Sequence, residues 1–151
     1  MPYPTVSLTD NPGVIYLSSV RPGRQFNILA SMFILDNAGN LVPLLPWSVT
    51  SISYTVWQVP DNLPPEITNP RMISGSGSFI PSAVIYPTML TGTAWSVASP
   101  LNGASGYNAN FPIPGSFIPN QATTYEVQIT TTLLSGTVFD DWYSTCTYNT
   151  P

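Results

Sequence analysis

The sequence has no histidine and no lysine, and its only basic residues are Arg21, Arg24 and Arg71. A hydrolase triad needs a general base beside its nucleophile, and histidine or lysine usually serves as that base. Two acidic side chains could still be placed for glycoside hydrolysis, but nothing selects a pair among the seven acidic residues. We therefore predict a protein that is not an enzyme, with no catalytic residue and no cofactor.

Metal ligands and cysteines are scarce as well. The adjacent acids Asp140 and Asp141 should point to opposite faces of a strand, so a polar strand is the better interpretation and a calcium site completed by loop oxygens is the alternative. Cys146 is the single cysteine, so it has no partner for an internal disulfide. Its apolar and aromatic neighbours predict a buried side chain. We expect no metal site.

Charge is low and negative. Charged residues make up 7% of the chain and the net charge is −4, whereas about 25% is usual. Nucleic-acid binding depends on clustered Lys and Arg, and an anionic membrane would need the same clusters, so we expect neither partner. No run approaches the roughly 20 apolar residues that cross a bilayer. The first ten residues have neither a basic nor an apolar region of the signal-peptide type, so no signal peptide is expected.

What is present is apolar and neutral polar material, since 43% of the 151 residues are hydrophobic. That length and composition suit one folded domain with a conventional core. We expect an extended N-terminal arm over residues 1–13 and a single domain over residues 14–151. With few charges, Ser, Thr, Asn, Gln and Pro must supply the surface. This suits either a protein packed against neighbours or a secreted domain with a neutral surface.

Seventeen prolines and ten glycines interrupt the chain, so no window of helical length keeps a period of 3.6 residues. The chain is predicted to be all-β, with regularly spaced strands typical of a sandwich or barrel. The expected strands cover residues 14–19, 25–36, 51–59, 71–79, 93–99, 107–113, 124–133 and 138–148. Tight turns are expected at residues 10–13 and 36–40, where Asp, Asn and Gly gather.

The stretch 122–148 predicts a hairpin that turns at Ser135-Gly136. On its first strand Tyr125, Val127 and Ile129 alternate with polar residues and should face the core. Together with Gly136 they match the pattern that determines the fold at the F strand of immunoglobulin-like and fibronectin type III domains, where the tyrosine returns its hydroxyl to the backbone upstream. The chain thus resembles an antiparallel β-sandwich of that type, with extended Pro-rich arms and loops. Val127 stands where true immunoglobulin domains carry their second cysteine.

The chain also resembles the immunoglobulin-like domains of tailed-bacteriophage virion proteins, in QFNILASMFILDNAGNLVPL, SISYTVWQV and TYEVQITTTLLSGTVF. This resemblance implies a structural protein located in the virion, most simply a capsid decoration or cement protein that binds and stabilises the particle. Its partners would then be the major capsid protein or other virion proteins, with many copies or a homo-oligomer in the assembly. A tail or baseplate component is the nearest alternative.

The aromatic residues leave a third interpretation open. Tryptophans anchor interfaces and also stack on sugar rings, so a glycan-binding adhesion module is the competing class. Trp95 and Trp142 are expected in the core, and Trp57 lies opposite the core set of its strand. The residues expected at an interface are Trp47, Trp57, Tyr3 and Phe33.

Overall fold

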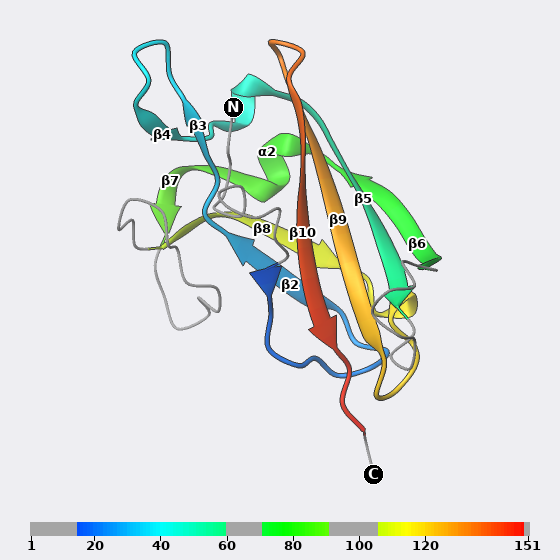
Figure 1. Ribbon diagram of the computed structural model, residues 1–151. Helices are drawn as coiled ribbons and strands as arrows, with labels where there is room; N and C mark the ends of the chain where they lie inside the picture. The colour runs from blue at the N-terminus through cyan, green and yellow to red at the C-terminus, as the bar shows by residue number, and fades with distance from the viewer. Residues whose placement is uncertain (1–14, 60–70, 91–105, 150–151) are drawn as a thin grey trace.

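The computed structural model describes residues 15–59, 71–90 and 106–149. Its elements are strands apart from one short α-helix and two 3-10 segments, so the all-β prediction is confirmed (Figure 1). In chain order they are β1 (Ile15–Tyr16), β2 (Phe26–Ala30), β3 (Phe33–Leu35), β4 (Leu41–Pro43), η1 (Pro46–Ser48), β5 (Val49–Val59), β6 (Met72–Phe79), α2 (Pro81–Val84), β7 (Ile85–Leu90), β8 (Tyr107–Ile113), η2 (Gly115–Phe117), β9 (Thr124–Leu133) and β10 (Val138–Cys146).

The strands form two main sheets and a small hairpin. The larger sheet has five strands in the order β1-β10-β9-β5-β6, and the smaller has three in the order β2-β8-β7. Neighbours are antiparallel in both, except that β1 runs parallel to β10. Strands β3 and β4 form the separate hairpin, which projects from one end of the molecule (Figure 1). Chain neighbours β8 and β9 lie in different sheets, as do β2 and β1.

The hydrophobic core draws on both main sheets. Strand β9 shows the cause most clearly, because its residues alternate between buried and half-buried along its whole length, so one face is covered and the other is not. Isoleucine, valine and aromatic side chains from the two sheets meet in a single buried cluster. Its fully buried members include Ile28, Val56, Phe111, Tyr125, Val127, Ile129 and Tyr143.

The predicted hairpin of the C-terminal region is present as β9 and β10. Its ladder runs from the pair Thr132 and Val138 to the pair Thr124 and Cys146. The turn is closed by a hydrogen bond from the Gly136 N–H to the Leu133 carbonyl at 2.9 Å. Gly136 has a φ of +92°, which a residue without a Cβ adopts at little cost.

Tyr125 is the second residue of β9 and is fully buried. Its hydroxyl accepts a hydrogen bond from the backbone N–H of Asn120, five residues upstream, at 3.1 Å. Val127 and Ile129 follow on the same inward face with no exposed surface. The strand alternation predicted for these three residues is therefore confirmed.

The long strand expected over residues 25–36 is divided into β2 and β3. Ser31 and Met32 separate them, and there the chain leaves the three-stranded sheet to enter the hairpin. The fully buried Asn108 of β8 holds this crossing point. Its side-chain oxygen accepts from the Met32 N–H at 2.7 Å, and its amide donates to the carbonyls of Met32 and Leu44 at 3.0 and 3.2 Å.

The turn expected at residues 36–40 joins β3 to β4. The Asp36 carboxylate accepts from the backbone N–H groups of Ala38 and Asn40, both at 2.8 Å. These bonds to the charged form, with that from Asn40 the strongest influence, hold the pKa of Asp36 below its ordinary value. Residues 36–40 therefore form a turn stabilised by its own aspartate.

Other expectations need correction. Strands β4 and β7 were not predicted, because each is short or contains a proline: Pro43 ends β4, and Pro87 lies within the edge strand β7, whose pairing with β8 is irregular. Strand β1 is shorter than the expected 14–19. The arm 1–13, the turn at 10–13 and the strand 93–99 with Trp95 lie outside the described residues.

Candidate interaction surfaces

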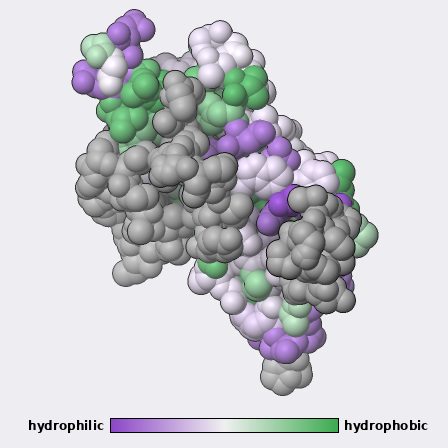
Figure 2. All heavy atoms as spheres, in the orientation of Figure 1, coloured by the Kyte–Doolittle hydropathy of each residue, from purple (hydrophilic) through white to green (hydrophobic). Residues whose placement is uncertain are grey.

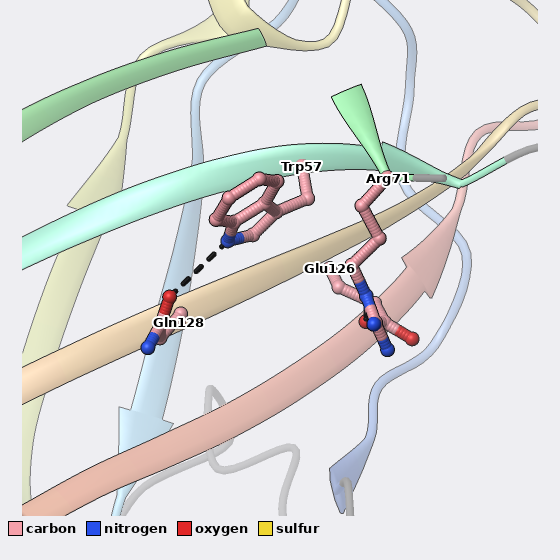
Figure 3. A network of polar contacts seen from close by, with 4 residues as sticks. All are labelled: Trp57, Arg71, Glu126 and Gln128. Atoms are coloured by element: carbon pink, nitrogen blue, oxygen red, sulfur yellow. Dashed lines mark hydrogen bonds and ion pairs between the residues drawn. The ribbon is translucent and has the colours of Figure 1, made fainter. Parts of the chain in front are cut away.

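The outer face of the five-stranded sheet, the face turned away from the core, carries Trp57. This residue lies on β5 opposite Glu126 of β9 and is half-buried. Its indole N–H donates a hydrogen bond of 3.2 Å to the side-chain oxygen of Gln128 (Figure 3). The side chain of Trp57 is thus on the face that the strand period predicted. Its indole N–H is already hydrogen-bonded within the protein.

The same network continues across β9 to β10. The amide of Gln128 donates to one carboxylate oxygen of Asp140 at 3.2 Å, and the hydroxyl of Thr130 donates to the other at 2.5 Å. Asp141 points to the opposite, inward face and is almost fully buried. The prediction that the two adjacent acids separate to opposite faces is therefore confirmed.

Trp142 also lies on the outer face, which corrects its expected place in the core. It is half-buried and faces Gln128 across the β9–β10 ladder. The guanidinium carbon of Arg71 lies 5.3 Å from the centre of its ring, within the range of a cation–π contact. Arg71 also donates to Glu126 at 2.6 Å, as Figure 3 shows. One arginine therefore joins the tryptophan and the acid of neighbouring strands.

Cys146 is a second correction on this face. It is exposed, and its sulfur lies 3.3 Å from the Thr124 hydroxyl. Along β10 it shares its face with Trp142 rather than with the buried Tyr143, because residues two and four apart point the same way. The aromatic sequence neighbours that suggested burial belong partly to the other face of the strand.

Trp47 lies at the end of the molecule that carries the β3–β4 turn, η1 and the β9–β10 turn, called here the turn end. It belongs to η1 and is 64% exposed. A backbone hydrogen bond of 2.9 Å from the Leu134 N–H to the Ser48 carbonyl joins η1 to the end of β9. Leu134 and Val138, on either side of the β9–β10 turn, are exposed as well, and so is Leu35 of β3.

The other two residues expected at an interface have different outcomes. Phe33 is 3% exposed, so it is not available to a partner on the described surface. It begins β3 directly after the point that Asn108 pins to β8, which holds this part of the hairpin against the body of the protein. Tyr3 lies outside the described residues.

A groove of about 440 Å³ opens at the turn end, between the β3–β4 hairpin and the β9–β10 hairpin. Figure 2 shows hydrophobic side chains gathered near both hairpins. The groove lining contains no charged residue and consists of Ile34, Leu35, Asn37, Ser48, Leu133, Leu134, Ser135 and Thr137. The sequence signal that could have indicated it is the pair Leu133-Leu134 before the turn, since one of two adjacent leucines must point away from the core.

The inward face of β10 contains a buried polar group that no hydrogen bond compensates. The hydroxyl of Tyr143 is fully buried and has no hydrogen-bond partner in the described part of the chain. Burial, together with the nearby charge of Asp141, raises the pKa of Tyr143 well above its ordinary value. The phenol therefore stays protonated, and it is enclosed away from any surface that a substrate could reach.

The described residues contain no group of three or more side chains suited to hold a metal ion, and no helix among them has the length and apolar character needed to cross a membrane. Comparison of the chain with protein-family models, with curated proteins and with solved structures found no match.

Proposed function

We propose that this protein is an immunoglobulin-like β-sandwich that serves as a non-enzymatic accessory structural protein of a virion, of the capsid decoration or cement type. The fold part of this proposal is supported by strand order. In variable-type immunoglobulin domains the sheet of strands G, F and C is extended by a C′ strand and faces a sheet containing B, E and D. The order β10-β9-β5-β6 facing β2-β8-β7 corresponds to that arrangement.

The tyrosine at the start of β9 supports the same fold. The tyrosine corner of these domains joins the hydroxyl of an F-strand tyrosine to the backbone a few residues upstream. Tyr125 makes a bond of this kind to Asn120. Because the corner depends on a specific side chain and a specific loop length, it supports the immunoglobulin-like assignment more strongly than the strand count does.

The observation that carries the functional part is the largely apolar turn end, where the exposed Asp36 is engaged by the backbone of its own turn. Leu35, Trp47, Leu134 and Val138 are all exposed there, around a groove without a charged residue. A contact through such a surface buries apolar area without removing charges from water, and exposed tryptophans are frequent anchors of protein interfaces. We propose that the turn end rests on the major capsid protein or another virion protein.

The outer face favours this contact over glycan binding. A sugar-binding platform needs aromatic rings with free faces, whereas Trp57 is tied to Gln128 and Trp142 has Arg71 over its ring. These contacts use the indole N–H of Trp57 and one face of the Trp142 ring. Protein–protein contact at the turn end is therefore the function we propose, and a tail or baseplate location would use the same surface.

The test compares two variants of equal exposure. Trp47 at the turn end and Ile73 on β6 are both 64% exposed, so Trp47→Asp and Ile73→Asp each place one charge on the surface. Virions would be produced from the genome that encodes this chain, with the parent or a variant gene. Antibody labelling and electron microscopy would locate the protein, while light scattering would give the mass of the purified chain.

We expect the parent protein at regular positions on the particle, unchanged occupancy for Ile73→Asp and strongly reduced occupancy for Trp47→Asp. Complete virions without the parent protein would overturn the virion assignment. Regular occupancy that Trp47→Asp leaves unaltered would keep the assignment and overturn the proposed contact surface. Retention of the purified parent protein on a sugar array, lost in Trp57→Ala, would favour the glycan-binding class.

A further inference from the structure

The N-terminal end of β1 points toward the end of the molecule that holds the groove. Strand β1 is parallel to β10, with Ile15 opposite Tyr143 and Tyr16 opposite Ser144. The start of β10 is Val138, which follows the groove residue Thr137. Because parallel strands begin at the same edge of a sheet, the N-terminal end of β1 is directed toward the side of Val138 and the groove.

The distance is short compared with the length of chain that precedes β1. Tyr143 lies five positions after Val138 along β10, which corresponds to about 17 Å at roughly 3.3 Å per residue. The fourteen residues before Ile15 can span up to about 46 Å when extended. The segment is therefore long enough to reach the groove from its own β1, even with a turn at residues 10–13.

The chemistry of the segment matches the groove. Residues 1–9, MPYPTVSLT, carry no charged side chain, and Tyr3, Val6 and Leu8 offer apolar groups to Leu35 and Leu134. An extended segment also needs partners for its backbone N–H and C=O groups, and the groove lining supplies Asn37, Ser48, Ser135 and Thr137. Pro2 and Pro4 reduce the entropy that such a segment loses on binding.

Two other segments outside the described residues are less suitable. Residues 60–70 follow Val59, at the end of β5 opposite to Val49 and η1, and they include Asp61 and Glu66. Residues 91–105 are uncharged, but they are joined at both ends to the three-stranded sheet through β7 and β8. Residues 91–105 are therefore the alternative occupant of the groove, and an experiment has to distinguish them from residues 1–9.

We propose that the groove at the turn end is a binding site for the N-terminal segment of the same chain, residues 1–9. The segment enters along β10 and places its apolar side chains between the β3–β4 hairpin and Leu134. Trp47 does not line the groove, so its surface stays available to a partner. This proposal does not depend on the virion role, because it concerns a contact within one chain.

The first experiment measures binding of a fluorescent peptide of residues 1–9 to a chain that begins at Asp10, by fluorescence polarisation. We expect saturable binding that Leu134→Asp weakens about tenfold or more, since an apolar contact of one leucine corresponds to at least such a factor. Ile73→Asp, an exposed apolar site on β6, is the matched control and should bind as the parent does. The intact chain should bind the added peptide more weakly than the shortened chain, because its own tethered segment competes.

Absence of saturable binding, or equal binding by the Leu134→Asp variant, would overturn the proposal, and the groove would then be assigned to residues 91–105 or to a partner. Equal binding by the intact and shortened chains would overturn the contact within one chain. The intact chain could also be a dimer in solution and the shortened chain a monomer. That result would overturn the contact within one chain as well, since the segment would then bind a second copy.

The second measurement uses the intact chain and does not require the shortened one to fold. Hydrogen exchange at the amides of Tyr3 and Thr5 to Thr9 reports directly on docking. We expect slow exchange in the parent and in Ile73→Asp, and markedly faster exchange in Leu134→Asp at unchanged exchange of the β9 amides. Fast exchange of these amides in the parent would overturn the proposal.

Discussion

The hydroxyl of Tyr125 accepts a hydrogen bond from the backbone N–H of Asn120, whereas the hydroxyl of Tyr143, equally buried on the neighbouring strand, has no hydrogen-bond partner in the described part of the chain. Both rings contribute to one core. The contrast between two otherwise similar side chains allows the contribution of a buried hydroxyl to be measured within one protein.

Tyr125→Phe should lower the free energy of unfolding by about 1 kcal/mol, because it removes the hydrogen bond that the Asn120 N–H donates to the phenol oxygen. Urea denaturation followed by circular dichroism would measure the change. An unaltered midpoint and slope would show that water or another acceptor replaces the phenol, and the corner would then contribute nothing to stability.

Tyr143→Phe should be neutral or should raise the free energy of unfolding by up to about 1 kcal/mol, because it removes a buried polar atom that gains no hydrogen bond on folding. The ring and its packing remain. The same urea titration would measure this change, with Tyr125→Phe as the comparison. A loss of stability comparable with that of Tyr125→Phe would contradict the description of the Tyr143 site.

The raised pKa of Tyr143 also predicts sensitivity to alkali. In the unfolded chain this phenol ionises near its ordinary pKa of about 10, while in the folded protein burial and the charge of Asp141 keep it protonated to higher pH. Above pH 10 the folded state therefore binds more protons than the unfolded state, and the free energy of unfolding falls as pH rises. Unfolding measured between pH 8 and pH 11 should show a shallower fall in Tyr143→Phe than in the parent; equal slopes would reject this cause.

Asn108→Ala should destabilise the protein by about 3 kcal/mol or more, because the Met32 N–H and the carbonyls of Met32 and Leu44 lose a buried partner. Asn27→Ala is a suitable control, since Asn27 bonds to Asn110 at an exposed site. Thermal unfolding would measure both variants. A small loss in Asn108→Ala would mean that the hairpin base is held chiefly by apolar packing.

Arg71→Ala should cost less than about 1 kcal/mol, since the ion pair with Glu126 is partly exposed to solvent and exposed pairs contribute little. Its clearer effect should be on Trp142, whose ring loses the guanidinium above it. Nuclear magnetic resonance would show shifted Trp142 ring signals in Arg71→Ala and unshifted ones in Arg24→Ala. Unshifted signals in both variants would contradict the cation–π contact.

Several elements could be predicted from the sequence because their causes are local. The alternation of Tyr125, Val127 and Ile129 with polar residues defines an inward face within one strand, and Ser135-Gly136 and residues 36–40 contain the residues that tight turns require. Each of these signals involves neighbours within about ten residues. These local signals did not predict β4 and β7. Both strands are short and contain a proline, which argues against a strand, and the rest of the fold stabilises them.

The surface depended on contacts that no local pattern contains. Whether Trp142, Cys146 and Phe33 are covered is decided by what packs on them, and the partners concerned, such as Arg71 for Trp142, are distant in sequence. The sequence by itself determined an all-β chain with few charges and a hairpin near its C-terminus, because period and turn chemistry act between near neighbours. Tertiary structure alone decided the groove, because Leu35, Ser48 and Leu134 come together only when three separate segments pack at one end.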